Sequence, residues 1–287
     1  MDAFISRLER SWQLIRASHD VLRADSALLI LPALSGIATF MLGAGFVAFA
    51  LSDGGFGPMR DGSSEPTKLF YVWLFCWYVV QYFVVIFFNT ALIGAAIELL
   101  EGGRPTVGTA LRLAYSRVWA ILGYAVISAT VGVLLRTLAE RLGFIGRLIE
   151  GVVGLAWTTA TFLVVPILAA EDIGPWQAIE RSTVLLRKSW GENLIGNAGI
   201  SLVMSAICTV VTVVGIGGGM LLFQRGEAVL GTAVFSAAVT TILLVVLVGA
   251  ALSAVYAAAV YHYAVTGKPP ADFDDDLIRD TFTHKGA

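Results

Sequence analysis

The stretch Ala228–Val265 reads AVLGTAVFSAAVTTILLVVLVGAALSAVYAAAVYHYAV and contains no Asp, Glu, Lys or Arg. An uncharged apolar run of about 18 residues is already long enough to suggest a membrane-spanning helix. Five further apolar runs precede it and can each cross a hydrocarbon core of about 30 Å. They are Ala27–Leu51, Leu69–Ile97, Val118–Leu135, Ile149–Ala170 and Leu194–Phe223. The pattern predicts an all-α, polytopic membrane protein with about six transmembrane helices.

The composition agrees with a chain whose solvent is largely lipid. Hydrophobic residues make up 57% of the sequence and charged residues 14%, whereas a soluble domain carries about 25% charge. The formal net charge of −2 provides no general basic surface for nucleic acid. The first apolar run is too long for the core of a secretory signal, which has about 7–15 residues, so we expect it to remain as an anchor.

Small residues distinguish the last two runs. Glycines near the end of the fifth run could unwind it: Gly215, Gly217, Gly218 and Gly219. In the sixth run Gly249, Ser253 and Ala257 follow one another at a spacing of four, which places them on one face of a helix. Small residues on one face allow helix backbones to approach closely. This stripe predicts that the sixth helix is central or lies at an oligomer contact.

The distribution of Lys and Arg predicts the orientation. With the N-terminus inside, the cytoplasmic segments hold 13 of the 19 Lys and Arg residues and the outer loops hold six. The positive-inside rule therefore favours two cytoplasmic termini in the cell membrane. Arg136, Arg141 and Arg147 oppose this orientation, because they fall together in one predicted outer loop.

Three segments on the predicted cytoplasmic side have the periodicity of amphipathic helices: residues 4–22, 107–118 and 176–190. Such helices are expected to lie in the headgroup plane, and packing on the bundle as a soluble flap is the alternative. The first and third share the pattern Arg-Ser-x-x-Leu-x-Arg-x-Ser, which begins at Arg10 and at Arg181. We therefore predict one membrane domain, residues 1–268, with three parallel repeats, each an interfacial helix followed by two spanning helices. The repeats cover about 1–104, 105–174 and 175–268, and residues 269–287 form a polar cytoplasmic tail.

Several short motifs carry a family resemblance. They are Arg10-Ser11-Trp12, Val165-Pro166, Glu171-Asp172-x-Gly174-Pro175-x-x-Ala178-Ile179-x-Arg181-Ser182 and Lys188-Ser189-Trp190-Gly191. Together they resemble an uncharacterised family of bacterial six-helix integral membrane proteins over roughly residues 4–266. That family is distantly similar to the membrane domain of glycerophosphodiester phosphodiesterases. The resemblance implies a fold and no activity, because the catalytic domain of those enzymes is absent from this sequence.

The sequence contains no motif that carries chemistry. It has no HExxH, no G-x-S-x-G and no Walker loop, and its three histidines show no metal spacing. Cys76 and Cys208 both fall inside apolar runs and indicate neither a disulfide nor a zinc site. We therefore expect no catalytic residue, no cofactor and no metal. The strongest polar groups inside the spans are Gln81 and Asn89, which either bond a neighbouring helix or form an intramembrane polar site.

Charged residues at the predicted membrane surface give two further candidate sites. Glu98 and Glu171 stand at C-terminal helix ends, where the helix dipole is already negative. A cation should therefore lie nearby and compensate the negative charge of each carboxylate. The candidate partners are Arg104, Arg112, Arg181 and Arg187, and at least one glutamate is expected within about 4 Å of an arginine. The candidate lipid-contact helix near the N-terminus carries Arg7, Arg10, Trp12 and Arg16.

Function follows only in outline from these features. The leading hypothesis is a non-enzymatic membrane protein that acts as a scaffold, a lipid-interface component or an accessory subunit. The alternative is a permease or channel for a small neutral or amphipathic solute, and an enzyme is the least favoured class. The expected partners are membrane lipids and either a second copy of the chain or another membrane protein, and not nucleic acid.

Overall fold

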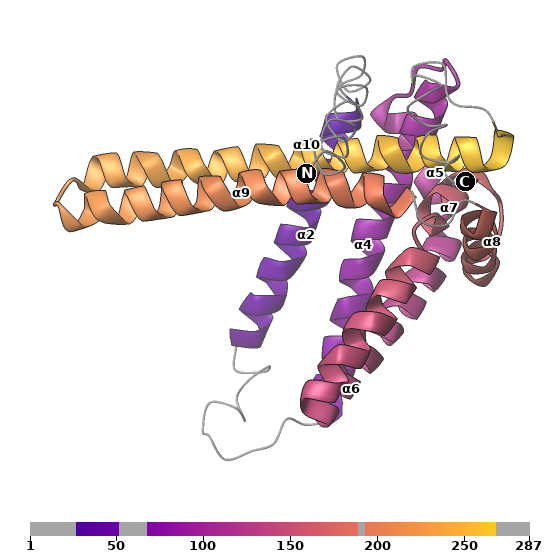
Figure 1. Ribbon diagram of the computed structural model, residues 1–287, viewed down its shortest axis with the longest axis horizontal. Coiled ribbons are helices and arrows are strands. Elements are labelled where there is room, and N and C mark those ends of the chain that lie inside the picture. The colour runs from indigo at the N-terminus through magenta and orange to yellow at the C-terminus, as the bar shows by residue number, and fades with distance from the viewer. Residues whose placement is uncertain (1–26, 52–67, 189–192, 268–287) are drawn as a thin grey trace, which may run out of the picture. The chain divides into compact units, whose positions relative to one another are not determined.

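The computed structural model of the protein describes residues 27–51, 68–188 and 193–267, and every regular element within these ranges is an α-helix (Figure 1). Six segments of these helices are long and apolar enough to cross a membrane. They are Leu28–Phe49, Val72–Leu100, Val118–Gly143, Gly146–Ala170, Leu202–Gln224 and Ala228–Thr266. The predicted helical, multi-pass membrane fold with six spans is confirmed.

The described residues fall into two compact units. One unit comprises residues 27–29, 96–104 and 193–267, and the other comprises residues 30–51, 68–95 and 105–188. The division does not follow the predicted boundaries of the repeats. The comparison of the first and third repeats depends on the helix around Arg10, which lies outside the described residues, so the repeat stays a prediction.

Most of α2 (Ala27–Leu51) and of α4 (Lys68–Leu100) lies in the second unit, where side-chain contacts join the two helices in antiparallel order. Near the C-terminal end of α2, Phe46 stacks on Trp73 near the N-terminal end of α4, with ring centroids 3.9 Å apart. The ring of Trp77, one turn further along α4, lies 4.4 Å from the same Phe46 ring. Aromatic stacking of this kind contributes to holding the two helices together.

The third and fourth spans form one helical hairpin, α6 (Val118–Ala160), which reverses at Gly143. Gly143 has φ 59° and ψ −126°, a backbone conformation that only glycine adopts without strain. Gly146 then passes so close to the backbone of Leu138 and Ala139 that a side chain there would clash. The expected loop around Arg136, Arg141 and Arg147 was therefore wrong, because the chain stays helical on both sides of a single sharp turn.

Short helices gather at the other end of this hairpin. After a break at Thr161–Leu163 the second leg of α6 continues as α7 (Val164–Ala170), and α8 (Pro175–Lys188) folds back on both. The helix α5 (Val107–Ser116) begins with a capping box formed by Thr106 and Thr109. Its Leu113 side chain lies directly over Gly94 of α4, so α5 closes this end of the second unit.

In the first unit, α9 (Asn193–Gln224) and α10 (Ala228–Thr266) run antiparallel along their length and are joined by a turn at Gly226 (Figure 1). The glycines of α9 do not unwind it, as the sequence had suggested, because they form the helix–helix contact. Gly215 lies against Ala238, and Gly219 lies against Gly231 of α10. From the predicted stripe, Gly249 of α10 meets Met204 of α9, which makes that position a contact within the chain.

Candidate functional site

The two strongest intramembrane polar residues do not form one site. The Nε2 atom of Gln81 donates a hydrogen bond to the backbone oxygen of Thr39 at 3.5 Å, so Gln81 connects α4 to α2. Asn89 lies eight residues further along α4, which corresponds to about 12 Å of helix. Within the described part of the chain, no hydrogen bond joins Asn89 to another residue. Gln81 therefore has a bracing role, and the two side chains do not converge on a solute.

The hydroxyl groups inside the spans are also committed to the protein. Seven threonines of α4, α6, α9 and α10 donate to the backbone oxygen four residues earlier in their own helix, at 2.7–2.9 Å. They are Thr90, Thr130, Thr158, Thr159, Thr209, Thr240 and Thr241. A hydroxyl that bonds its own helix is satisfied without water or solute. These residues therefore give no support to a polar solute pathway.

At the predicted cytoplasmic end of the second unit, Glu171 makes the expected contact with an arginine. The Nε atom of Arg181 lies 3.3 Å from Oε1 of Glu171, and both side chains are partly exposed. The contact ties α8 to the residue that ends α7. The prediction required only one such contact, and Glu98, with Arg104 and Arg112 as its candidate partners, was the other glutamate considered.

Glu98 lies in a different local arrangement. The chain reverses directly after α4, Gly102 adopts a left-handed conformation, and the amide of Gly103 donates to the backbone oxygen of Glu98 at 2.8 Å. The backbone of Gly103 thus occupies the place beside Glu98 where an arginine was expected. Among the described residues, neither Arg104 nor Arg112 makes an ion pair with Glu98, and both arginines are exposed.

A second ion pair joins Arg117 to Asp172. Arg117 precedes the third span and Asp172 follows the fourth, so the two residues close the open end of the α6–α7 hairpin. Neither Arg117 nor its contact with Asp172 was predicted from the sequence. The signal was present, because the start and the end of a spanning hairpin must return to the same membrane surface.

In the sequence, Ser182 stands out only as part of a repeated motif. In the structure its hydroxyl group makes hydrogen bonds to the backbone of the hairpin. It is fully buried in α8, donates to the backbone oxygen of Ala160 at 2.7 Å and accepts from the amide of Leu163 at 3.2 Å. These two backbone groups flank the break between α6 and α7, where helical hydrogen bonds are interrupted. Ser182 therefore replaces missing backbone hydrogen bonds and fastens α8 to the hairpin.

Three large aromatic side chains remain exposed at this same end. Tyr115 of α5 is 72% exposed, Trp119 of α6 is 81% exposed and Trp176 of α8 is 69% exposed. Pro175 packs against Gly123 of α6, which places Trp176 close to the first turns of that helix. Tyr and Trp are enriched where a membrane protein meets the headgroup layer. We refer to the ion pairs, Ser182 and these aromatic residues as the α8 platform.

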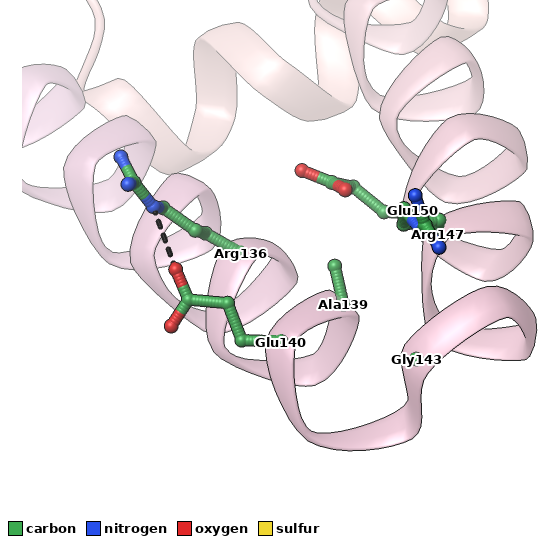
Figure 2. A pocket seen from close by; sticks show the side chains of 6 residues that line it. All are labelled: Arg136, Ala139, Glu140, Gly143, Arg147 and Glu150. Carbon is green, nitrogen blue, oxygen red and sulfur yellow. Dashed lines mark hydrogen bonds and ion pairs between the residues drawn. The ribbon is translucent and has the colours of Figure 1, made fainter.

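The opposite end of the hairpin carries a charged cavity that the sequence analysis did not predict (Figure 2). Six residues on the two legs of α6 line it: Arg136, Ala139, Glu140, Gly143, Arg147 and Glu150. Arg136 and Glu150 each stand seven residues from Gly143, so the reversal at Gly143 brings their two helical turns to the same level. Once that reversal is known, the positions of the charged residues in the sequence predict that they come together at this end of the hairpin.

Metal ligands do not gather anywhere in the described ranges, where no three residues of the His, Cys, Asp and Glu types lie close enough to hold an ion. Cys76 and Cys208 are free thiols. Several sequence candidates cannot be placed. Arg7, Arg10, Trp12 and Arg16 lie outside the described residues, as does the side chain of Arg187.

Comparison with known proteins gives one family. A model described as "Family of unknown function (DUF6159)" matches residues 68–271, from the first residue of α4 to just beyond α10. None of the curated proteins compared with the chain matches it. The resemblance to an uncharacterised family is therefore supported, and no comparison supports the more distant similarity to the membrane domain of glycerophosphodiester phosphodiesterases.

Proposed function

The chain belongs to this family of unknown function, and from its multi-pass helical fold we propose that it is a non-enzymatic membrane protein that organises the lipid–protein interface. In this role the spans serve as a scaffold, and the α8 platform is the part that meets the headgroups. The membrane in question is the cell membrane, and its lipids are the first partners of the protein. Both termini are assigned to the cytoplasmic side, which is also the side of the α8 platform.

The observation that carries the proposal is the way α8 is fixed. It is held to the hairpin by Ser182, by the ion pair of Arg181 with Glu171 and by the packing of Pro175 on Gly123. The face that α8 buries includes Ala178, Ser182 and Leu185, which leaves Trp176 and Val184 outward. Because α8 is fixed in this way, its outward apolar side chains stay at one depth relative to the hairpin. An interfacial helix needs such an arrangement to keep its apolar side chains at the membrane surface.

The polar groups inside the spans favour the same role over transport. A permease needs polar or ionisable groups that face a substrate path near the middle of the bilayer. Here the seven threonine hydroxyls are satisfied within their own helices, and the amide of Gln81 connects α4 to α2.

Labelling of single cysteines in proteoliposomes tests the position of the α8 platform. In a Cys76→Ser/Cys208→Ser background, Trp176→Cys should react with a lipid-soluble maleimide and resist a water-soluble one. Arg112→Cys, an exposed position on α5, is the matched control and should react with the water-soluble reagent. Equal labelling of both positions by the water-soluble reagent would place Trp176 in water and remove the basis of the proposal.

A flux assay tests the role itself. Proteoliposomes containing the full chain should pass neutral and amphipathic solutes no faster than protein-free liposomes. Saturable uptake of any solute in the panel would overturn the scaffold role in favour of a permease. Because flux and labelling are independent, a failure of the platform and a failure of the scaffold role can be told apart.

A further inference from the structure

The charged cavity at the reversal of α6 is a shallow, wide-open hollow with a volume of about 560 Å³. Pockets that take small ligands have volumes of about 300–1,000 Å³, so a phosphodiester headgroup fits within it. The walls come from two helical legs joined at Gly143, and Figure 2 shows the Glu150 side chain directed into the space between them. The reversal at Gly143 thus shapes the cavity as well as the fold.

The four charges that line the cavity differ in their partners. The Nε atom of Arg136 lies 3.0 Å from Oε1 of Glu140, and its Nη1 atom donates to the Tyr78 hydroxyl at 3.3 Å. On the other leg, Arg147 and Glu150 make no ion pair with any residue in the described ranges. One guanidinium and one carboxylate therefore remain to bind opposite charges. They are three residues apart on one helix, where side chains are neighbours about 5–6 Å apart.

The length of the spans sets the depth of the cavity. Residues 118–135 of the first leg carry no charge, and neither do residues 151–170 of the second. At 1.5 Å per residue these segments measure about 27 Å and about 30 Å, close to the thickness of the hydrocarbon core. The cavity begins where they end, so its charges lie among lipid headgroups and avoid the cost of burial in hydrocarbon.

We propose that this cavity binds the headgroup of a zwitterionic phospholipid that carries a primary ammonium. Arg147 binds the phosphate, because the guanidinium fork holds two phosphate oxygens at once. Glu150 accepts hydrogen bonds from the ammonium, which a two-carbon linker joins to the phosphate. The inference requires that the helices span a bilayer, and it does not depend on the role proposed for the α8 platform.

Other headgroups fit the cavity less well. An anionic headgroup would satisfy Arg147 and leave the Glu150 carboxylate facing a net negative ligand. A quaternary ammonium has no N–H to donate, and proteins usually bind one with aromatic rings. None of the six described lining residues is aromatic. Recognition of both charges together therefore favours the primary ammonium.

Native mass spectrometry of the full chain in detergent tests the selectivity. The protein is mixed with equal amounts of phosphatidylethanolamine, phosphatidylcholine and phosphatidylglycerol that carry the same acyl chains. We expect phosphatidylethanolamine to be retained on the order of tenfold more than the other two, as for one additional hydrogen bond to a charged group. Water-soluble phosphoethanolamine at the same concentration should not displace it, since the proposed ligand is a lipid.

Three variants locate the site. Glu150→Gln should reduce the retention of phosphatidylethanolamine to the level of phosphatidylcholine, whereas Arg147→Gln should lower the retention of all three lipids, because each of them carries the phosphate. Arg141→Gln is the matched control, because Arg141 is an exposed arginine of the same turn that does not line the cavity, and it should keep the wild-type selectivity. Equal retention of the three lipids by the wild type, a preference for phosphatidylglycerol, displacement by phosphoethanolamine, or an equal loss in Arg141→Gln would each overturn the proposal. If a variant fails to fold, the relative retention of the three lipids by the wild-type protein still tests the proposal.

Discussion

Arg117 and Asp172 stand 55 positions apart in the sequence and meet as an ion pair across the open end of one helical hairpin. The Arg117 side chain is 19% exposed and that of Asp172 is 89% exposed, so one partner is largely buried and the other is solvated. The pair marks the level at which both legs leave the hydrocarbon. It also supplies a direct test of the α8 platform, because Asp172 lies between α7 and α8.

A double-mutant cycle should measure the coupling of this pair. Arg117→Gln, Asp172→Asn and the double variant should give a coupling energy of about 0.5–1 kcal/mol, since one partner remains in water. The free energy of unfolding in detergent, measured by denaturant titration, is the readout. Arg112→Gln combined with Asp172→Asn is the control and should be additive. Additivity in the Arg117 cycle as well would show that the contact contributes no stability.

Ser182→Ala should loosen α8. The substitution leaves the amide of Leu163 and the backbone oxygen of Ala160 without their side-chain partner, at a cost of about 1–3 kcal/mol. Thr183→Ala is the matched control, because that hydroxyl bonds only the nearby Glu180 backbone oxygen. Thermal unfolding should shift downward for Ser182→Ala and little for Thr183→Ala. If both variants unfold at the same temperature, Ser182 does not fasten the helix.

Gly215→Ala should separate α9 from α10. The added methyl group would collide with Ala238, and overpacking of this kind costs about 1–3 kcal/mol. Gly217→Ala meets nothing within 4 Å and should be neutral or stabilising by up to about 1 kcal/mol, because alanine is the better helix former. Denaturant titration distinguishes the two. Adding Ala238→Gly to Gly215→Ala should restore stability, and the absence of any rescue would contradict the contact.

Gly143→Ala should strain the reversal of α6. The φ of 59° with ψ of −126° is accessible to glycine alone, so a side chain there should cost about 1–3 kcal/mol. Gly151→Ala, in the regular part of the second leg with nothing within 4 Å, should instead be tolerated. The lipid selectivity of Gly143→Ala should fall together with its thermal stability. If Gly143→Ala loses stability but keeps its full lipid selectivity, the conformation of the turn does not determine lipid binding in the cavity.

The orientation can be measured directly. In the Cys76→Ser/Cys208→Ser background, Arg141→Cys should react with a membrane-impermeant maleimide on intact cells. Arg104→Cys should react only after the cells are opened, because the excess of Lys and Arg places it inside. The reverse pattern would mean that the three arginines around the α6 turn determine the topology.

The six spans could be predicted because charge in hydrocarbon is costly, about 2.5–3.5 kcal/mol for each Asp, Lys or Arg at the centre of a helix. That cost is visible in the sequence as long uncharged runs, and the structure has helices at all six. The shape of the third connection could not be predicted in the same way. Once a helix leaves the bilayer it can carry charges freely, so Arg136 and Arg147 gave no sign that the chain stays helical up to Gly143.

The candidate sites were harder to predict than the spans. Glu171 was expected to meet an arginine because it stands at a C-terminal helix end, and Arg181 is among the cations nearest to it in sequence. Arg117 and Ser182 were missed because their partners are distant in sequence or are backbone atoms, which carry no residue-type signal. The glycines of α9 gave an ambiguous signal, since glycine weakens a helix and also lets two helices approach. Packing against α10 decided between these effects.

The pairing of α9 with α10 has a consequence for the thickness of the membrane around the protein. Their spanning segments have 23 and 39 residues and measure about 35 Å and about 58 Å, while an average hydrocarbon core measures about 30 Å. Two helices locked through Gly215 and Gly219 must meet this mismatch as one rigid rod, by tilting together or by stretching the lipids beside them. Each ångström of mismatch costs a fraction of a kcal/mol, so the rod makes the protein sensitive to acyl-chain length and favours its partition into the thicker regions of a bilayer.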